Sequence, residues 1–272
     1  MARPVIGLLT DFGTKDHYAG TMKGVALGIC PEAACVDITH EIPPHDILAG
    51  ALELAASYKY FPPATVFLVV VDPGVGSSRR AIAAEAGAYR FVAPDNGILT
   101  LVFRDAPPRR VVELTERRYA RPTVSRTFEG RDRFAPAAAW LAKGIDLSGL
   151  GRVLTSWQQL AVPEPVVGET EIVADVLRVD RFGNLVTNVD RRTFERFAGS
   201  GGIAIVAGTQ AVGTVVATYA DAAPGSLCAL CGSSEHLEVA VNGGSAAERL
   251  ALARGARITI SRTRHQAPGT KD

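Results

Sequence analysis

The chain has 272 residues, a mass of 28.7 kDa and nearly balanced charge, with 29 basic against 28 acidic residues. This length is sufficient for two domains, and the lack of a basic excess argues against a general nucleic-acid binder. The longest purely aliphatic or aromatic run, residues 66–71, is far shorter than the roughly 20 apolar residues of a membrane helix, so no membrane association is expected. The first residues lack the apolar region of a signal peptide, which predicts a cytoplasmic protein.

The four cysteines are too few for a disulfide scaffold. Cys228 and Cys231 form a C-x-x-C pair, but zinc would require two further ligands at suitable spacing. A redox pair should open a helix, whereas this one lies in an apolar, strand-like run. We interpret both as small apolar residues of a core and predict no metal site.

The first 163 residues are predicted to form an α/β domain. Buried-strand patterns over 5–10, 34–38, 65–71 and 81–84 are interspersed with helical patterns over 18–29, 46–60 and 131–143. Such alternation indicates a largely parallel sheet. Asp11 and Asp72 directly follow two of these strands. Because open α/β sheets bind ligands at the carboxyl ends of their strands, we expect both residues near a ligand.

The remaining residues have a different pattern, with short β-branched segments in place of alternating strands and helices. Residues 164–168 are Pro-rich and predicted to be a linker, residues 169–262 a smaller, mostly antiparallel, β-barrel-like domain, and residues 263–272 a frayed tail. Short helices are expected over 191–197 and 246–252. The predicted strands, several of them separated by glycine-rich turns, cover 172–179, 185–189, 203–206, 212–218, 237–241 and 258–260.

Two stretches of the first domain carry candidate chemistry. Asp11 either binds ribose hydroxyls or serves as a turn or cap residue. The stretch 71–80 begins like a dinucleotide-binding loop, but Arg79 occupies the position of the third glycine and a strand pattern follows, which disfavours that interpretation. Asp72 and Arg79 therefore form either a structural salt bridge or an acid and a guanidinium beside a ligand. His40 is expected to lie in the core or cap an element, whereas His17 and His45 have no assigned role.

The second domain contains three glycine-containing stretches with the same ambiguity. Asp180, Phe182 and Asn184 form either a β-turn with a core phenylalanine or a base-stacking and base-reading group. Residues 233–234 and 242–243 either expose amides suited to a carboxylate or a purine, or form turns, Asn-Gly being a good hairpin turn.

Taken together, these motifs resemble the S-adenosyl-L-methionine hydroxide adenosyltransferase family, the hydrolytic relatives of the fluorinase and chlorinase. The resemblance extends in order from about residue 5 to residue 260. It rests on Leu-Leu-Thr-Asp-Phe-Gly, Val-Asp-Pro-Gly-Val-Gly, Ala-Pro-Asp-Asn-Gly, Gly-Arg-Asp-x-Phe-Ala-Pro, Phe-Gly-Asn-Leu-Val-Thr-Asn and Val-Asn-Gly-Gly-Ser-Ala-Ala.

The resemblance implies an α/β N-terminal domain and a β-barrel-like C-terminal domain. It implies a homotrimer that binds S-adenosyl-L-methionine between the N-terminal domain of one subunit and the C-terminal domain of the next. Water or hydroxide attacks C5′ of the ribose and releases adenosine and L-methionine, with no metal or cofactor.

The family motifs also imply substrate-binding roles for particular residues. Asp11 corresponds to the ribose ligand and Asp16 to a ligand near the methionine end. The expected contacts of the C-terminal domain are Asp180, Phe182 and Asn184 to the methionine amine and adenine, Ser233 and Ser234 to the methionine carboxylate, and Asn242 with Gly243 to the adenine.

The expected catalytic residues are Asp72, Arg79 and Glu129. Asp72 and Arg79 match two members of the family's Asp, Arg, His triad that handles water. The halogenases have tyrosine in place of Asp72, so Asp72 favours hydrolysis. Glu129 stands where the family has histidine, and it either acts as the base or only pairs with Arg79. The alternatives are a catalytically impaired protein that binds S-adenosylmethionine or adenosine, a halogenase, and a methyltransferase using the same ligand.

Overall fold

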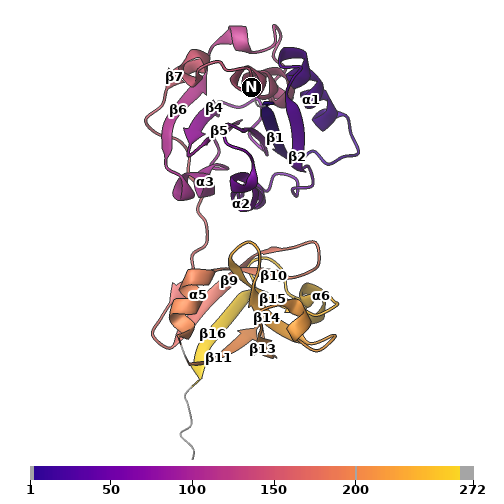
Figure 1. The fold of residues 1–272 in the computed structure, drawn as a ribbon, viewed down its shortest axis with the longest axis vertical. Helices are drawn as coiled ribbons and strands as arrows, with labels where there is room; N and C mark the ends of the chain where they lie inside the picture. The colour runs from indigo at the N-terminus through magenta and orange to yellow at the C-terminus, as the bar shows by residue number, and fades with distance from the viewer. Residues whose placement is uncertain (1–2, 200, 264–272) are drawn as a thin grey trace, which may run out of the picture. The chain divides into compact units, whose positions relative to one another are not determined.

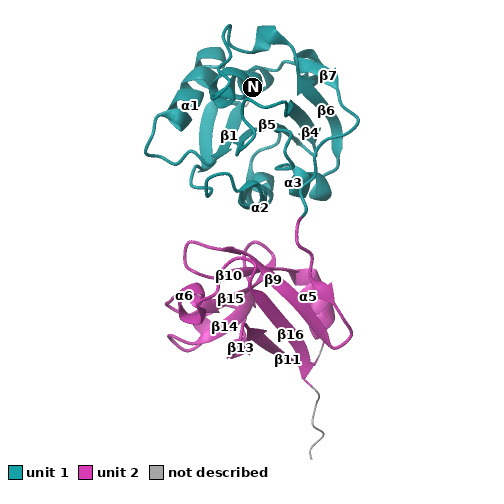
Figure 2. Cartoon of the chain, turned by 180° about the vertical axis from the view of Figure 1, so that it is seen from behind, with its two compact units in different colours: residues 1–161 teal, residues 162–272 magenta. Residues whose placement is uncertain are grey.

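The computed structural model describes residues 3–199 and 201–263. The chain folds as two compact units, residues 1–161 and 162–272 (Figure 2); the sequence placed this division after residue 163. Part of the expected linker is a strand, because β8 (Val166–Val167) pairs with β9 (Glu171–Val179). Val166 and Val167 are β-branched and pair with the edge of β9 despite the neighbouring prolines. The expected tail lies outside the described residues from residue 264 onward.

Unit 1 contains a seven-stranded sheet of order β2-β1-β3-β5-β4-β6-β7 (Figure 1). The first four strands are parallel and the last three are added antiparallel. The α/β prediction is confirmed, and the strand over 5–10 has its predicted bounds, whereas β6 and β7 were not predicted. The strands are β1 (Val5–Thr10), β2 (Ala34–Thr39), β3 (Val66–Val70), β4 (Ala81–Ala86), β5 (Tyr89–Pro94), β6 (Pro108–Leu114) and β7 (Gly151–Val153).

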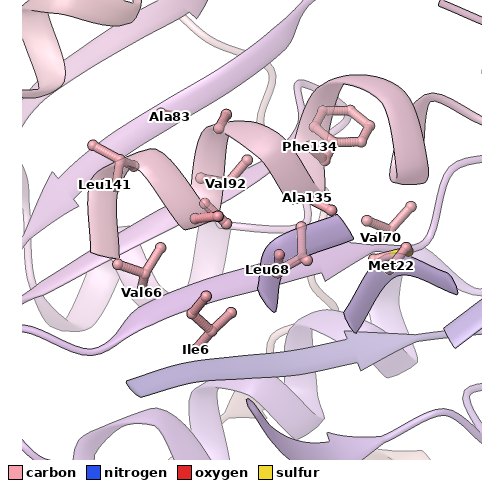
Figure 3. Packing of buried hydrophobic residues seen from close by; sticks show 14 of the residues in the cluster. Ile6, Met22, Val66, Leu68, Val70, Ala83, Val92, Phe134, Ala135 and Leu141 are labelled. Carbon is pink, nitrogen blue, oxygen red and sulfur yellow. The ribbon is translucent and has the colours of Figure 1, made fainter. Parts of the chain in front are cut away.

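Helices cover both faces of this sheet. One face packs against α1 (Tyr18–Ile29) and α4 (Ala135–Ala142), the latter preceded by a π-helical turn over 130–134 (Figure 3). The other face packs against α2 (Ile47–Ser57) and α3 (Thr100–Asp105). Because both faces are covered, the central strands are apolar throughout, which is the pattern that made β1 and β3 recognisable. Short 3₁₀ turns lie at Tyr58–Tyr60, Arg117–Tyr119, Leu147–Leu150 and, in unit 2, Tyr219–Asp221.

Unit 2 is a barrel-like sheet of order β12-β11-β16-β9-β10-β15-β14-β13 around its own apolar core. The two strands at the ends of this path, β12 and β13, are separated in the chain only by Gly213, so the sheet is nearly closed. The segment 212–218, which we predicted to be a single strand, therefore contributes to two short strands. The elements are β10 (Leu185–Asp190), α5 (Arg191–Ala198), β11 (Gly202–Ala207), β12 (Gln210–Val212), β13 (Thr214–Val215), β14 (Leu227–Cys231), β15 (His236–Val241), α6 (Ala246–Leu250) and β16 (Arg257–Thr263).

The remaining sequence expectations concern cysteines and membranes. All four thiols are free, and Cys228 is buried on β14, where burial raises its pKa. Within residues 3–199 and 201–263, no helix has the length and apolar character needed to cross a membrane.

Gly183 holds the 180–184 turn against the start of α6, which yields a stability prediction. Its φ is +84°, and a Cβ there would lie 2.1 Å from Oγ of Ser245, the residue that caps α6. Gly255 has nearly the same positive φ, +83°, but a Cβ at that residue would have nothing within 4 Å. We expect Gly183→Ala to lower the free energy of unfolding by about 1–3 kcal/mol more than Gly255→Ala, because only the former adds a clash to the backbone cost. Urea unfolding of the full chain followed by circular dichroism measures this, and equal losses would contradict it.

Candidate functional site

Three predicted residues line one cleft of unit 1, with a volume of about 250 Å³. Asp11 follows β1 and Asp72 follows β3. Because β1 and β3 are parallel neighbours, their carboxyl ends meet at the same edge of the sheet. Glu129, which directly precedes the π-helical turn over 130–134, also lines the cleft. The structure thus brings together carboxylates that are far apart in the sequence.

Arg79 joins two of these carboxylates. Its Nε donates to Oδ1 of Asp72 at 2.9 Å, and its Nη2 donates to Oδ2 of Asp72 and to Oε2 of Glu129. The side chains of Arg79, Asp72 and Glu129 are only 10%, 4% and 11% exposed, respectively. Burial alone would lower the pKa of Arg79, but the hydrogen bonds and charges of Asp72 and Glu129 raise it above its usual value. The guanidinium is therefore a permanent cation that offsets two buried carboxylates.

An aromatic wall lines the same cleft, and no sequence pattern indicated it. Phe12, Tyr18 and Phe128 are mutually adjacent, with ring centroids 5.0–6.0 Å apart. Aromatic faces and carboxylates both attract cations. The cleft is thus suited to a ligand that has positive charge beside apolar surface.

The loop before α2 completes the cleft. His45 lines it, and the backbone N–H of His45 donates to Oδ2 of Asp11 at 2.8 Å. Asp16, expected at the methionine end, is exposed and is not among the residues that line this cleft. His40 is buried as expected, with Nδ1 2.8 Å from Oγ1 of Thr10.

In unit 2, Asp180 organises the turn that contains Phe182 and Asn184. Its Oδ1 accepts from the backbone N–H groups of both residues at 2.9 Å, and its Oδ2 accepts from Nδ2 of Asn184 at 2.8 Å. Phe182 is 76% exposed. Of the two sequence interpretations, the turn is present but the phenylalanine is not a core residue. Its exposed ring is available for stacking.

Unit 2 contains a second polar cluster, which no sequence pattern predicted. The Tyr219 hydroxyl donates to Oε2 of Glu238 at 2.9 Å and lies 3.5 Å from Nδ2 of Asn184. Burial raises the pKa of Glu238, which the bond from Tyr219 partly opposes. No pattern in the sequence marks this cluster, because Tyr219 lies in a short 3₁₀ turn outside the predicted elements and Glu238 looks like an ordinary outward strand residue.

The other predicted residues of unit 2 have mixed environments. Ser233 is exposed, and Oγ of Ser234 is buried with no hydrogen-bond partner among the described residues. Nδ2 of Asn242 donates to the backbone oxygen of Ala222 at 2.7 Å, and Gly243 has φ +78°. In the part of the chain that the structure describes, no three His, Cys, Asp or Glu side chains gather as metal ligands.

Comparison with known proteins identifies the family of this chain. The model of the SAM hydroxide adenosyltransferase N-terminal domain matches residues 6–151, and that of the C-terminal domain of the same family matches residues 174–259. The chain belongs to the SAM hydroxide adenosyltransferase family.

Curated members of the family and related enzymes are similar over most of the chain. A protein of Thermus thermophilus named (R)-S-adenosyl-L-methionine hydrolase is 40% identical over 95% of this chain and 99% of its own length. One of the same name from Salinispora tropica is 38% identical over 95% and 98%. A fluorinase of Actinoplanes is more distant, at 30% identity over 71% of this chain and 74% of its own.

Solved structures have the same fold. An uncharacterized conserved protein from Thermotoga maritima has a TM-score of 0.90 and 38% identity, covering 94% of this chain and all of that one. A conserved hypothetical protein from Thermus thermophilus has a TM-score of 0.76 and 37% identity, covering 96% of this chain and all of its own.

At position 129, the family resemblance led us to expect histidine, and this chain has Glu129. Its Oε2 bonds to Arg79, and its Oε1 lies 3.7 Å from Nη2 of Arg133, one helical turn further along. Arg133 also lines a larger groove of about 810 Å³ around residues 113–124, which contains none of the predicted site residues. Both oxygens of Glu129 therefore have cationic neighbours.

Removal of the Arg79 side chain tests how far the fold depends on this cluster. We expect Arg79→Met to lower the free energy of unfolding by about 3–5 kcal/mol, because two buried carboxylates lose their cation. Arg118→Met is a matched control: Arg118 is 67% exposed and lies 3.8 Å from Glu116, so its loss should cost at most about 1 kcal/mol. Urea unfolding of both variants measures the difference, and similar losses would show that the Arg79 cluster is not buried in solution.

Proposed function

We propose that this protein hydrolyses S-adenosyl-L-methionine to adenosine and L-methionine by attack of water or hydroxide at C5′ of the ribose. The observation that carries the proposal is a cleft lined by an aromatic wall and by Asp72 and Glu129, which Arg79 joins, in a chain whose two halves both match the family models. Relatives that share 38–40% identity over nearly their whole length are named hydrolases of this substrate.

The charge of the cleft fits the substrate and the reaction. The sulfonium is a cation, and Asp11, Asp72 and Glu129 all line the cleft. As the bond from oxygen to C5′ forms, the C5′–S bond breaks and its electron pair goes to sulfur, which leaves as the neutral thioether of methionine. Because this leaving group needs no Lewis acid, we propose that the reaction requires neither metal nor cofactor, so dialysis against a chelator should leave the rate unchanged.

We assign the attacking water to Asp72 and Arg79. Both Nε and Nη2 of Arg79 are engaged by carboxylates, whereas its Nη1 has no hydrogen-bond partner among the described residues. Nη1 is thus the donor that orients the water, and Asp72 accepts from it. A fixed in-line arrangement of this kind can contribute about 7–11 kcal/mol in the best cases.

Asp11 is the ribose ligand in this proposal. Its Oδ2 accepts the N–H of His45, so Oδ1 is left for a ribose hydroxyl. In unit 2 the exposed ring of Phe182 and the amide of Asn184 contact the adenine. The remaining family positions keep their expected roles: Asp16 near the methionine end, Asp180 toward the methionine amine, Ser233 and Ser234 toward its carboxylate, and Asn242 with Gly243 toward the adenine.

The products distinguish this function from its alternatives. We expect purified protein to convert S-adenosylmethionine to equal amounts of adenosine and methionine, independent of chloride or fluoride, as measured by liquid chromatography with mass detection. Because the relatives are named for the (R) compound, the two sulfonium epimers are assayed separately, and we expect the (R) epimer to react faster. A 5′-halogenated adenosine would identify a halogenase, S-adenosylhomocysteine a methyltransferase, and tight binding without turnover a binding protein.

We also propose a homotrimer, in which the residues of unit 1 and of unit 2 that contact one substrate come from neighbouring subunits. The support is the family resemblance and the division of the predicted ligands between two units. Native mass spectrometry should give three times the 28.7 kDa mass of the chain. A monomer that is fully active would contradict this arrangement. The cytoplasmic location stays a prediction of the sequence.

A further inference from the structure

The proposed reaction requires an acceptor for the proton that water loses. The cleft carboxylates are poorly placed for this task. Asp72 has both oxygens bonded to Arg79, and Glu129 lies between two guanidinium groups. The lone pairs that are bonded to a guanidinium are committed, so what remains on Asp72 accepts a hydrogen bond from the water and positions it. Asp11 is occupied by a backbone N–H and by the ribose in the proposed complex.

His45 is the one histidine of the described residues that lines the cleft. It is also the one described histidine whose ring has no hydrogen bond or ion pair. The rings of the other three are engaged: His17 with Thr21 at 3.1 Å, His40 with Thr10 and Asp37 at 2.8 and 3.0 Å, and His236 with the backbone oxygen of Ser234 at 2.8 Å. An imidazole with an uncommitted nitrogen is the type of group that serves most often as a general base.

The backbone of His45 is held in an unusual conformation. Its φ is +69°, in the left-handed region that non-glycine residues rarely adopt. Two prolines precede it, its N–H is fixed by Asp11, and its carbonyl oxygen accepts from the N–H of Ile47 at 3.1 Å. Left-handed non-glycine residues that are held by their surroundings cluster at functional sites. The fold thus presents this ring at the cleft and keeps it exposed to solvent.

We propose that His45 is the general base of the reaction, an inference that rests on the proposed function. The neutral imidazole takes the proton from the water that Arg79 orients. The oxygen then bonds to C5′ as the C5′–S bond breaks and its electron pair goes to sulfur. The imidazolium returns the proton to bulk solvent, which its exposure permits. Glu129 acts through Arg79 as a positioning residue.

The decisive variant is His45→Gly, because glycine adopts φ +69° without strain and leaves space for a small ring. We expect kcat to fall about 100-fold or more, with KM for S-adenosylmethionine within about threefold of the wild type. Added imidazole should restore at least a tenth of the lost rate. Pyrazole, a ring of the same size but a much weaker base, should not. His45→Asn, which also tolerates this conformation, should show the same loss.

Controls separate this role from folding and from stacking on the ligand. Arg118→Met, at an exposed residue that does not line the cleft, should retain wild-type kinetics, and imidazole should not affect the wild type. Glu129→Gln should lower kcat less than His45→Gly and should not respond to imidazole. Circular dichroism and melting temperature establish that each variant is folded.

The inference is overturned if the His45→Gly rate stays within tenfold of the wild type. It is also overturned if a larger loss is not restored by imidazole, or is restored equally by pyrazole, since that pattern would show a ring that only packs on the substrate. Failure of the proposed function looks different: the wild type itself would then release no adenosine and methionine.

Discussion

The site depends on a single guanidinium that holds two buried carboxylates. Arg79 connects the end of β3, through Asp72, to the start of the π-helical turn, through Glu129. Neither carboxylate is tolerable in so buried a place without a cation, so the three side chains must be assembled before any ligand arrives. The parallel pairing of β1 with β3 then places Asp11 at the same edge. The site is therefore preorganised by the same contacts that stabilise the first unit.

The residue at position 129 has an electrostatic consequence. A neutral imidazole there would leave Arg79 paired with Asp72 alone, whereas Glu129 adds a negative charge to the same guanidinium. The cleft becomes more attractive to a sulfonium and less attractive to an anionic nucleophile such as a halide. In the proposed reaction, this change and Asp72 act in the same direction, toward water as the nucleophile.

The sequence predicted those parts of the structure that rest on local patterns. Residues 5–10 and 18–29 were assigned with their observed bounds, because an apolar strand and a helix closed by Pro31 are local signals. Asp11 and Asp72 followed from their places at strand ends. The aromatic wall and the Tyr219–Glu238 pair did not, because each depends on partners brought near only by the tertiary fold. The strand at 166–167 was missed for a local reason: the neighbouring prolines predict a linker, whereas the segment pairs with the next strand of the chain. The prediction of one strand over 212–218 was wrong. The chain leaves β12, at one end of the sheet, and enters β13, at the other end, at Gly213.

The two tasks that we propose for the site, orienting water and accepting its proton, make different physical demands, and the proposal assigns them to different places in the structure. Orienting water requires a rigid, buried donor, and Arg79 has that rigidity because Asp72 and Glu129 immobilise it. Accepting a proton requires a neutral base that can exchange with solvent, which a buried residue clamped between cations cannot do. His45 lies on an exposed loop, yet its backbone is fixed by Asp11, so it has access to solvent without loss of position. A carboxylate at position 129 is therefore compatible with hydrolysis when the imidazole is supplied from the loop before α2: the buried position strengthens the clamp, and the exposed one moves the proton.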